Sequence, residues 1–296
     1  TFKAAAPNVD VQPALAKAQW ANAMGLACGA VLGGLLPDAF GMTALKYGIS
    51  IYDASYAASF AVMVGVLIYT MLAIAEEPRP LNRNALRQGF ANVPSVIAEA
   101  GLLALKHPTL SMLLAALALF LMATNPVEVI WPTYAKPMLD EGYANTVIGA
   151  LTAGYFFAIA FGASLSPYIS RILRRRHAVT LAAIFACLAV VQVALAMQGG
   201  IAGFVGVFVL YSIILGASET PASSILHRCV EDRQRSTMLS LRSLIQQLGA
   251  AIGLVMAGAL ADMYSTPLAW IVGAVFLLTA MALSLVLAKR LAAEAE

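Results

Sequence analysis

Long apolar runs alternate along the chain with short stretches rich in proline, glycine and charge. Each run is about 19 to 24 residues long, which is enough for an α-helix to cross a hydrocarbon core of about 30 Å. The pattern predicts eight transmembrane helices. They cover residues 18–36, 54–76, 109–130, 146–169, 178–197, 201–221, 238–261 and 268–288.

The composition points to the same architecture. Hydrophobic residues make up 61% of the chain and charged residues 11%, outside the range of water-soluble domains. The net charge of +3 is scattered between the apolar runs, which excludes a nucleic-acid-binding surface built from clustered Lys and Arg. We therefore expect an all-α polytopic transmembrane bundle in contact with a lipid bilayer. Its three cysteines, Cys28, Cys187 and Cys229, are expected to form no disulfide.

The basic residues predict the orientation of the chain in the membrane. With eight spans, sixteen of the eighteen Lys and Arg residues fall on the side of the N-terminus, and only Lys46 and Lys136 fall on the other. The positive-inside rule then places both termini and the basic loops in the cytoplasm. We predict an integral protein of the plasma membrane, that is, a bacterial inner membrane.

Two segments of the chain repeat each other. Residues 25–38 read GLACGAVLGGLLPD and residues 249–262 read GAAIGLVMAGALAD, so that both carry small residues at matching places and end in Leu-x-Asp. The matched spans are the first and the seventh, which predicts a repeat unit of six parallel-related helices. The domains expected are 1–76 (the last two helices of an N-terminal half), 77–108 (a cytoplasmic central loop) and 109–296 (a six-helix C-terminal half).

Glycines of this repeat form a packing motif. At such spacing glycine lets helix backbones approach closely, either as a static contact or as a surface on which helices rock against each other. The residues concerned are Gly25, Gly29, Gly33, Gly34, Gly249, Gly253 and Gly258.

The first of these segments resembles a motif of the major facilitator superfamily. Gly25-x-x-x-Gly29-Ala30-x-x-Gly33-Gly34 is similar to the fifth-helix antiporter motif GxxxGPxxGG, with Ala30 in place of proline, and Ser170 to Arg175 is similar to the DRxGRR loop motif. The resemblance implies helices five to twelve of a twelve-helix transporter, with an upstream extension of about 120 to 150 residues for four more spans. It also implies that Arg171 and Arg174 help to close the cytoplasmic side.

A few polar residues within or beside the spans are candidates for function. Glu128 follows Asn125-Pro126 near the predicted outer end of the third span, where Pro126 is expected to break the helix. In a partly dry cavity its carboxylate could exchange a proton for a cationic ligand; at the helix mouth it would simply be solvated. Glu219 lies at the inner end of the sixth span, as a gating ion-pair partner for a nearby arginine or as an interfacial residue.

Amides and phenols within spans are a second group of candidates. They can line a substrate pathway with Glu128 and Asn125, or can form hydrogen bonds between helices. The group consists of Tyr155, Gln192, Tyr211 and Gln246.

These features together predict a secondary active transporter for a small molecule, namely proton-coupled efflux of lipophilic or drug-like compounds. The alternatives are an uptake transporter for a sugar or organic metabolite, and a non-transport membrane protein derived from a fragment of this family. An enzyme is not expected, because DDxxD, HExxH, GxSG and GxxxxGK[ST] motifs are absent. The three histidines are too scattered to indicate a metal site, and no cofactor is expected.

Overall fold

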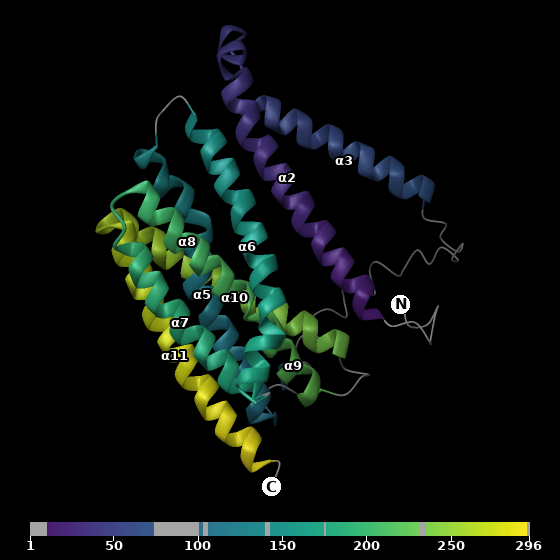
Figure 1. The fold of residues 1–296 in the computed structure, drawn as a ribbon, viewed down its shortest axis with the longest axis vertical. Helices are drawn as coiled ribbons and strands as arrows, with labels where there is room; N and C mark the ends of the chain where they lie inside the picture. Colours follow the sequence, from purple (N-terminus) through teal and green to yellow (C-terminus); the bar gives the residue numbers. More distant parts are fainter. Residues whose placement is uncertain are drawn as a thin grey trace.

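The computed structural model describes residues 11–73, 101–102, 106–139, 143–174, 176–230 and 235–294, and all regular structure in these residues is helical (Figure 1). Most of the predicted central loop, 77–108, lies outside the described residues. The helices are α2 (Val11–Lys46), α3 (Asp53–Ala73), α5 (Pro108–Ala135), α6 (Ala144–Ile172), α7 (His177–Ala196), α8 (Ile201–Gly216), α9 (Glu219–Cys229), α10 (Arg235–Met263) and α11 (Thr266–Ala293), with a short 3-10 helix, η1 (Lys136–Met138).

Eight segments of the described chain are long and apolar enough to cross a membrane, and each matches one predicted span. α8 and α9 together form one of them, Ile201–Cys229, because the chain turns only at residues 217–218 between the two helices. The predicted fold, an all-α bundle with eight spans, is confirmed. An even number of crossings brings the start of α2 and the end of α11 to the same side, and each is the lower end of its own helix in the view of Figure 1.

α5 differs from its predicted form. The expected break at Asn125-Pro126 is wrong, because the helix continues through Pro126 and Pro132 to Ala135. Each proline removes one backbone donor, yet neighbouring helices can compensate for the freed carbonyl inside a bundle. Glu128 consequently lies about two turns inside α5, and not at the helix mouth, which was one of the two positions considered for it.

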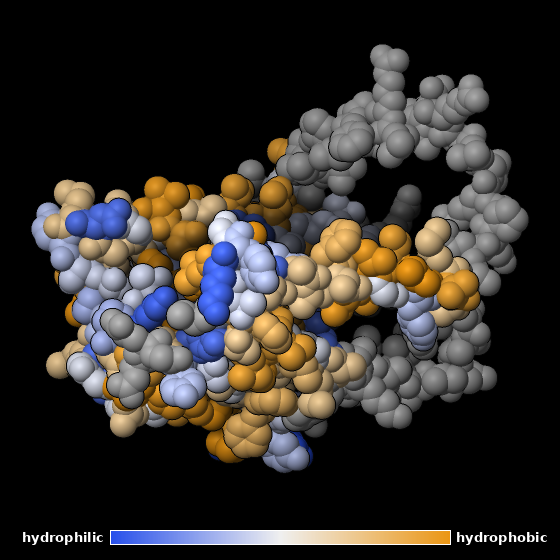
Figure 2. Space-filling model, turned by 90° about the horizontal axis from the view of Figure 1, so that it is seen from above, coloured by the Kyte–Doolittle hydropathy of each residue, from blue (hydrophilic) through white to orange (hydrophobic). Residues whose placement is uncertain are grey.

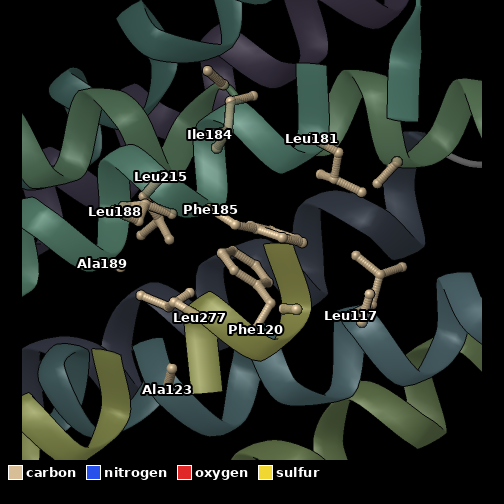
Figure 3. Close-up of a cluster of buried hydrophobic side chains, with 14 of the residues drawn as sticks. Leu117, Phe120, Ala123, Leu181, Ile184, Phe185, Leu188, Ala189, Leu215 and Leu277 are labelled. Carbon is tan, nitrogen blue, oxygen red and sulfur yellow. The ribbon is translucent and has the colours of Figure 1, made fainter. Parts of the chain in front are cut away.

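The centre of the bundle is a packed apolar core. α11 packs against α5 and α7, α10 against α5, and α8 against α6 and α7. Leucine, alanine and phenylalanine side chains from these helices fill the space between them, and the rings of Phe120 and Phe185 stack with centroids 5.1 Å apart (Figure 3). Close packing of this kind holds the helices of a membrane protein together where water cannot drive them inward.

Glycines determine where two pairs of helices touch backbone to backbone. A Cβ atom on Gly162 or Gly216 would overlap a carbonyl oxygen of the facing helix, so α6 and α8 can meet here only through glycine. Gly249 and Gly253 do the same for α10, because a Cβ at either would overlap a carbonyl oxygen of α5.

α2 and α3 lie to one side of this core. α2 runs along α6, whereas α3 extends away from the other helices as a largely apolar arm and has no buried residue (Figures 1 and 2). α2 meets α6 at Gly34 and Gly149, where an added Cβ would overlap backbone of the facing helix. The first two spans therefore join the rest of the described bundle mainly through the contact between α2 and α6.

Candidate functional site

Three of the sequence-predicted residues come together between α5, α6 and α8. Tyr155 on α6 lies within interaction distance of the carboxylate of Glu128 on α5. Tyr211 on α8 is fully buried and lies within electrostatic reach of both side chains. Its hydroxyl has no hydrogen-bond partner among the described residues. The three helices thus place one carboxylate and two phenols near one another, in what we call the Glu128 cluster.

Aromatic rings surround this cluster. The rings of Tyr155 and Phe208 stack with centroids 5.7 Å apart, and the ring centroids of Phe208 and Trp131 are 4.8 Å apart. Phe204 in turn stacks on Phe208 at 5.5 Å. Aromatic faces offer large apolar contact and also attract cations through the ring quadrupole. The Glu128 cluster therefore has the chemistry to accept a lipophilic molecule that carries a positive charge or a hydrogen-bond donor.

Local backbone features position the Glu128 cluster. The direct contact of α6 with α8 at Gly162 and Gly216 brings these two helices close together, and Tyr155 and Tyr211 with them. Pro132 has no N–H, so the backbone carbonyl of Glu128, four residues earlier, loses its usual helical donor. Asn125 lies one turn before Glu128 on the same helix and is half-buried. The site therefore combines free acceptors with a protonatable group.

Gln192 has a different environment from that cluster. It is completely buried in α7, and its side-chain amide donates hydrogen bonds to the carbonyl oxygens of Ala123 at 3.3 Å and Trp270 at 2.9 Å. These bonds connect α7 to α5 and α11. The geometry favours the second of the two interpretations we considered for buried amides, an interhelical hydrogen bond, and we leave Gln192 out of the proposed pathway.

A second polar cluster lies where α9 and α10 begin. The guanidinium of Arg242 is almost completely buried and donates to Glu219 at 2.6 Å, to Ser223 at 3.0 Å and to Gln246 at 3.1 Å. Ser223 also donates to Glu219 at 2.7 Å. Gln246 therefore belongs to this group, which we call the Arg242 cluster, and not to the Glu128 cluster. Arg242 is the arginine that Glu219 contacts among the several that follow it in sequence.

Arg171 and Arg174 lie apart from the Arg242 cluster. Both are exposed at the end of α6, and the Arg171 guanidinium sits over the ring of Tyr168, 4.5 Å from its centroid. Arg174 occupies the tight turn before α7 with a φ of 54°. Their part in closing the cytoplasmic side remains a prediction from the family resemblance.

The two copies of the internal repeat use different glycines. In the first copy Gly34 is in close contact with α6, whereas an added Cβ at Gly25, Gly29 or Gly33 would meet no described atom within 4 Å. In the second copy the pattern is reversed: Gly249 and Gly253 contact α5, and Gly258 faces open space. The packing motif is thus one sequence pattern with two different sets of contacts.

Asp38 makes an interhelical contact that the sequence analysis did not predict. The residue stood out there only because both repeated segments end in aspartate. Its carboxylate accepts hydrogen bonds from the Asn145 side chain at 2.8 Å, the Thr146 amide at 2.7 Å and the Thr146 hydroxyl at 2.6 Å. These groups form the first turn of α6, whose free amides and positive dipole end favour a carboxylate. Asp38 thus fastens α2 to the N-terminus of α6, at the end opposite the Arg242 cluster.

The fold and these clusters define a polytopic helical membrane protein with polar groups buried between its spans. The sequence matches the Major Facilitator Superfamily over residues 127–296, more than half of the chain. The protein therefore belongs to this family of membrane transporters, which are not enzymes. No curated protein and no solved structure matches the chain.

Proposed function

We propose that this transporter exports lipophilic, amphipathic small molecules in exchange for protons, and that Glu128 is its proton- and substrate-binding carboxylate. The observation that carries the proposal is the Glu128 cluster, in which one carboxylate meets two phenols inside an aromatic wall built by three helices. Such a group within membrane spans costs free energy to bury, and is therefore usually functional.

The cluster suggests how exchange would work. A proton on Glu128 neutralises its charge, and a cationic or donor-bearing substrate replaces that proton by pairing with the carboxylate. Tyr155, within interaction distance, orients the carboxylate, and the unpaired hydroxyl of Tyr211 is available to a polar group of the substrate. Because proton and substrate compete for one carboxylate, binding one would release the other, which couples their movements.

Two contacts at opposite ends of the bundle support alternating access. Asp38 joins α2 to the start of α6, and these helices belong to different halves of the predicted repeat. Arg242 holds the beginning of α10 against α9 at the end predicted to face the cytoplasm. We assign both contacts as latches: opening either side of the site would require one of them to break.

The test is transport in inside-out vesicles that contain the full chain. A proton gradient is imposed and the movement of lipophilic cationic dyes is followed for the wild type, Glu128→Gln and Asp262→Asn. Asp262 is an exposed carboxylate at the end of α10, so its variant is a matched control for the loss of one charge.

We expect gradient-driven dye movement in the wild type and the Asp262→Asn variant, and none above empty vesicles in Glu128→Gln. Tyr155→Phe, which keeps the carboxylate but removes the phenol hydroxyl beside it, should give an intermediate rate. Undiminished movement in Glu128→Gln would remove Glu128 from the mechanism, and a wild type that moves no dye would overturn lipophilic efflux itself.

A further inference from the structure

A cavity of about 530 Å³ lies among the ends of α7, α9 and α11. None of the residues that line it belongs to the Glu128 cluster. Three basic residues at the ends of three helices line it: Arg176 directly before α7, Arg228 in the last turn of α9 and Lys289 near the end of α11. The remaining lining is largely apolar and includes Ile225, Leu285 and Leu291. The cavity therefore has a cationic part and an apolar part.

The described residues around this cavity carry positive charge without a matching negative one. None of those that line it is a carboxylate. The nearby Glu294 accepts a hydrogen bond from Thr109 at 2.8 Å and does not line the cavity. Three cationic side chains around one space repel each other unless an anion lies between them. The start of α7 adds to this preference, because residues 176–179 line the cavity and the first amides of a helix favour negative charge.

The position of the cavity matches the boundary between membrane and water. Its basic residues come from the ends of three helices, on the side that the charge pattern predicts to be cytoplasmic. Leu285 lies one helical turn inside Lys289, toward the middle of the membrane. The cationic part thus lies at headgroup depth and the apolar part at the depth where acyl chains begin.

An exposed apolar stripe continues from the cavity along α11. Leu285, Leu278 and Ile271 follow each other at intervals of seven residues, which places them on one face of the helix, and they are 42%, 47% and 39% exposed. From Lys289 to Ile271 the stripe is about 27 Å long. That length accommodates an extended acyl chain, whereas a small soluble anion would make no contact with this apolar stripe.

We propose that this cavity binds an acidic phospholipid, with the phosphate among Arg176, Arg228 and Lys289 and an acyl chain along the Leu285 stripe of α11. Basic pockets between transmembrane helices are suited to anionic headgroups. The lipid would hold the ends of α7, α9 and α11 together on the cytoplasmic side, and α9 is also the helix that carries Glu219.

The test is lipid binding to the purified, delipidated full chain, followed by native mass spectrometry. The chain is titrated with phosphatidylglycerol and with phosphatidylcholine of the same acyl composition. The variants are Arg228→Gln and Lys289→Gln, with Arg290→Gln as control, because Arg290 is the exposed neighbour of Lys289 and does not line the cavity.

We expect phosphatidylglycerol to bind preferentially, and each cavity variant to bind it about fivefold more weakly, as the loss of one cation near the surface predicts. Arg290→Gln should bind as the wild type does. Size-exclusion profiles identify a variant that fails to fold, and Arg176→Gln then replaces it. Equal weakening by Arg290→Gln, or equal binding of both lipids, would overturn the proposal. Displacement of phosphatidylglycerol by glycerol 3-phosphate would overturn it in favour of a soluble anion.

Discussion

Removing the Asp38 carboxylate should loosen the contact between α2 and α6. In the Asp38→Ala variant, the side chain of Asn145 and both donors of Thr146 lose their acceptor at the start of α6. Gly34 and Gly149 would still hold the two backbones together further along the helices. We therefore expect the ends of α2 and α6 to separate without unfolding of the bundle.

The size of the effect follows from the three hydrogen bonds. Each contributes about 0.5 to 1.5 kcal/mol net, and the lower part of that range applies because Asp38 and Thr146 are only half-buried. A total of about 2 kcal/mol corresponds to about a thirtyfold change in the ratio of closed to open forms. A closed form that dominates by about a hundred to one would then dominate by only about three to one.

Pulsed electron paramagnetic resonance measures this separation directly. Spin labels are placed at Phe40 on α2 and Tyr143 before α6, both exposed, in a background where the three native cysteines are replaced by serine. The wild type should give one short distance, and Asp38→Ala should add a longer population of about a quarter of the molecules. Asp262→Ala, which removes the repeat-related but exposed carboxylate, should leave the distribution unchanged.

An unchanged distribution in Asp38→Ala would refute the assignment of Asp38 as a latch. It would mean that the glycine contact alone holds α2 on α6. A longer population in Asp262→Ala as well would show that the change reflects general destabilisation and not the lost contact.

Two further substitutions test the packing and the second latch. Gly216→Ala should lower the thermal stability strongly, because the added Cβ would overlap the carbonyl oxygen of Ile159. Gly206→Ala, in the same helix but facing open space, should leave the melting temperature unchanged. Equal melting temperatures of the two variants would contradict this prediction. Arg242→Lys should fail to restore the transport lost in Arg242→Gln, since lysine cannot donate in three fixed directions to Glu219 and its neighbours. Full activity of the lysine variant in the vesicle assay would show that charge alone matters there.

The sites were only partly accessible to sequence reasoning. Glu128, Tyr155 and Tyr211 stood out singly, because a carboxylate or phenol is unusual within an apolar run. Their meeting point depends on how α5, α6 and α8 pack, and that packing depends on glycines that face particular carbonyls. Gln192 had the same appearance in sequence, yet its amide is used between helices.

Hydropathy alone was enough to predict the eight spans, because crossing a membrane requires only a local run of apolar residues whose backbone bonds are satisfied within the helix. The similarity of residues 25–38 and 249–262, from which we predict a six-helix repeat, was likewise visible as a pattern along one chain. Tertiary structure decided which members of that pattern touch anything. Gly34 contacts α6 while Gly258 faces open space, and Asp38 caps a helix while Asp262 is exposed, because each copy has different neighbours. The hydrophobicity of a helix is fixed by its own sequence, whereas its contacts depend on which helices pack against it.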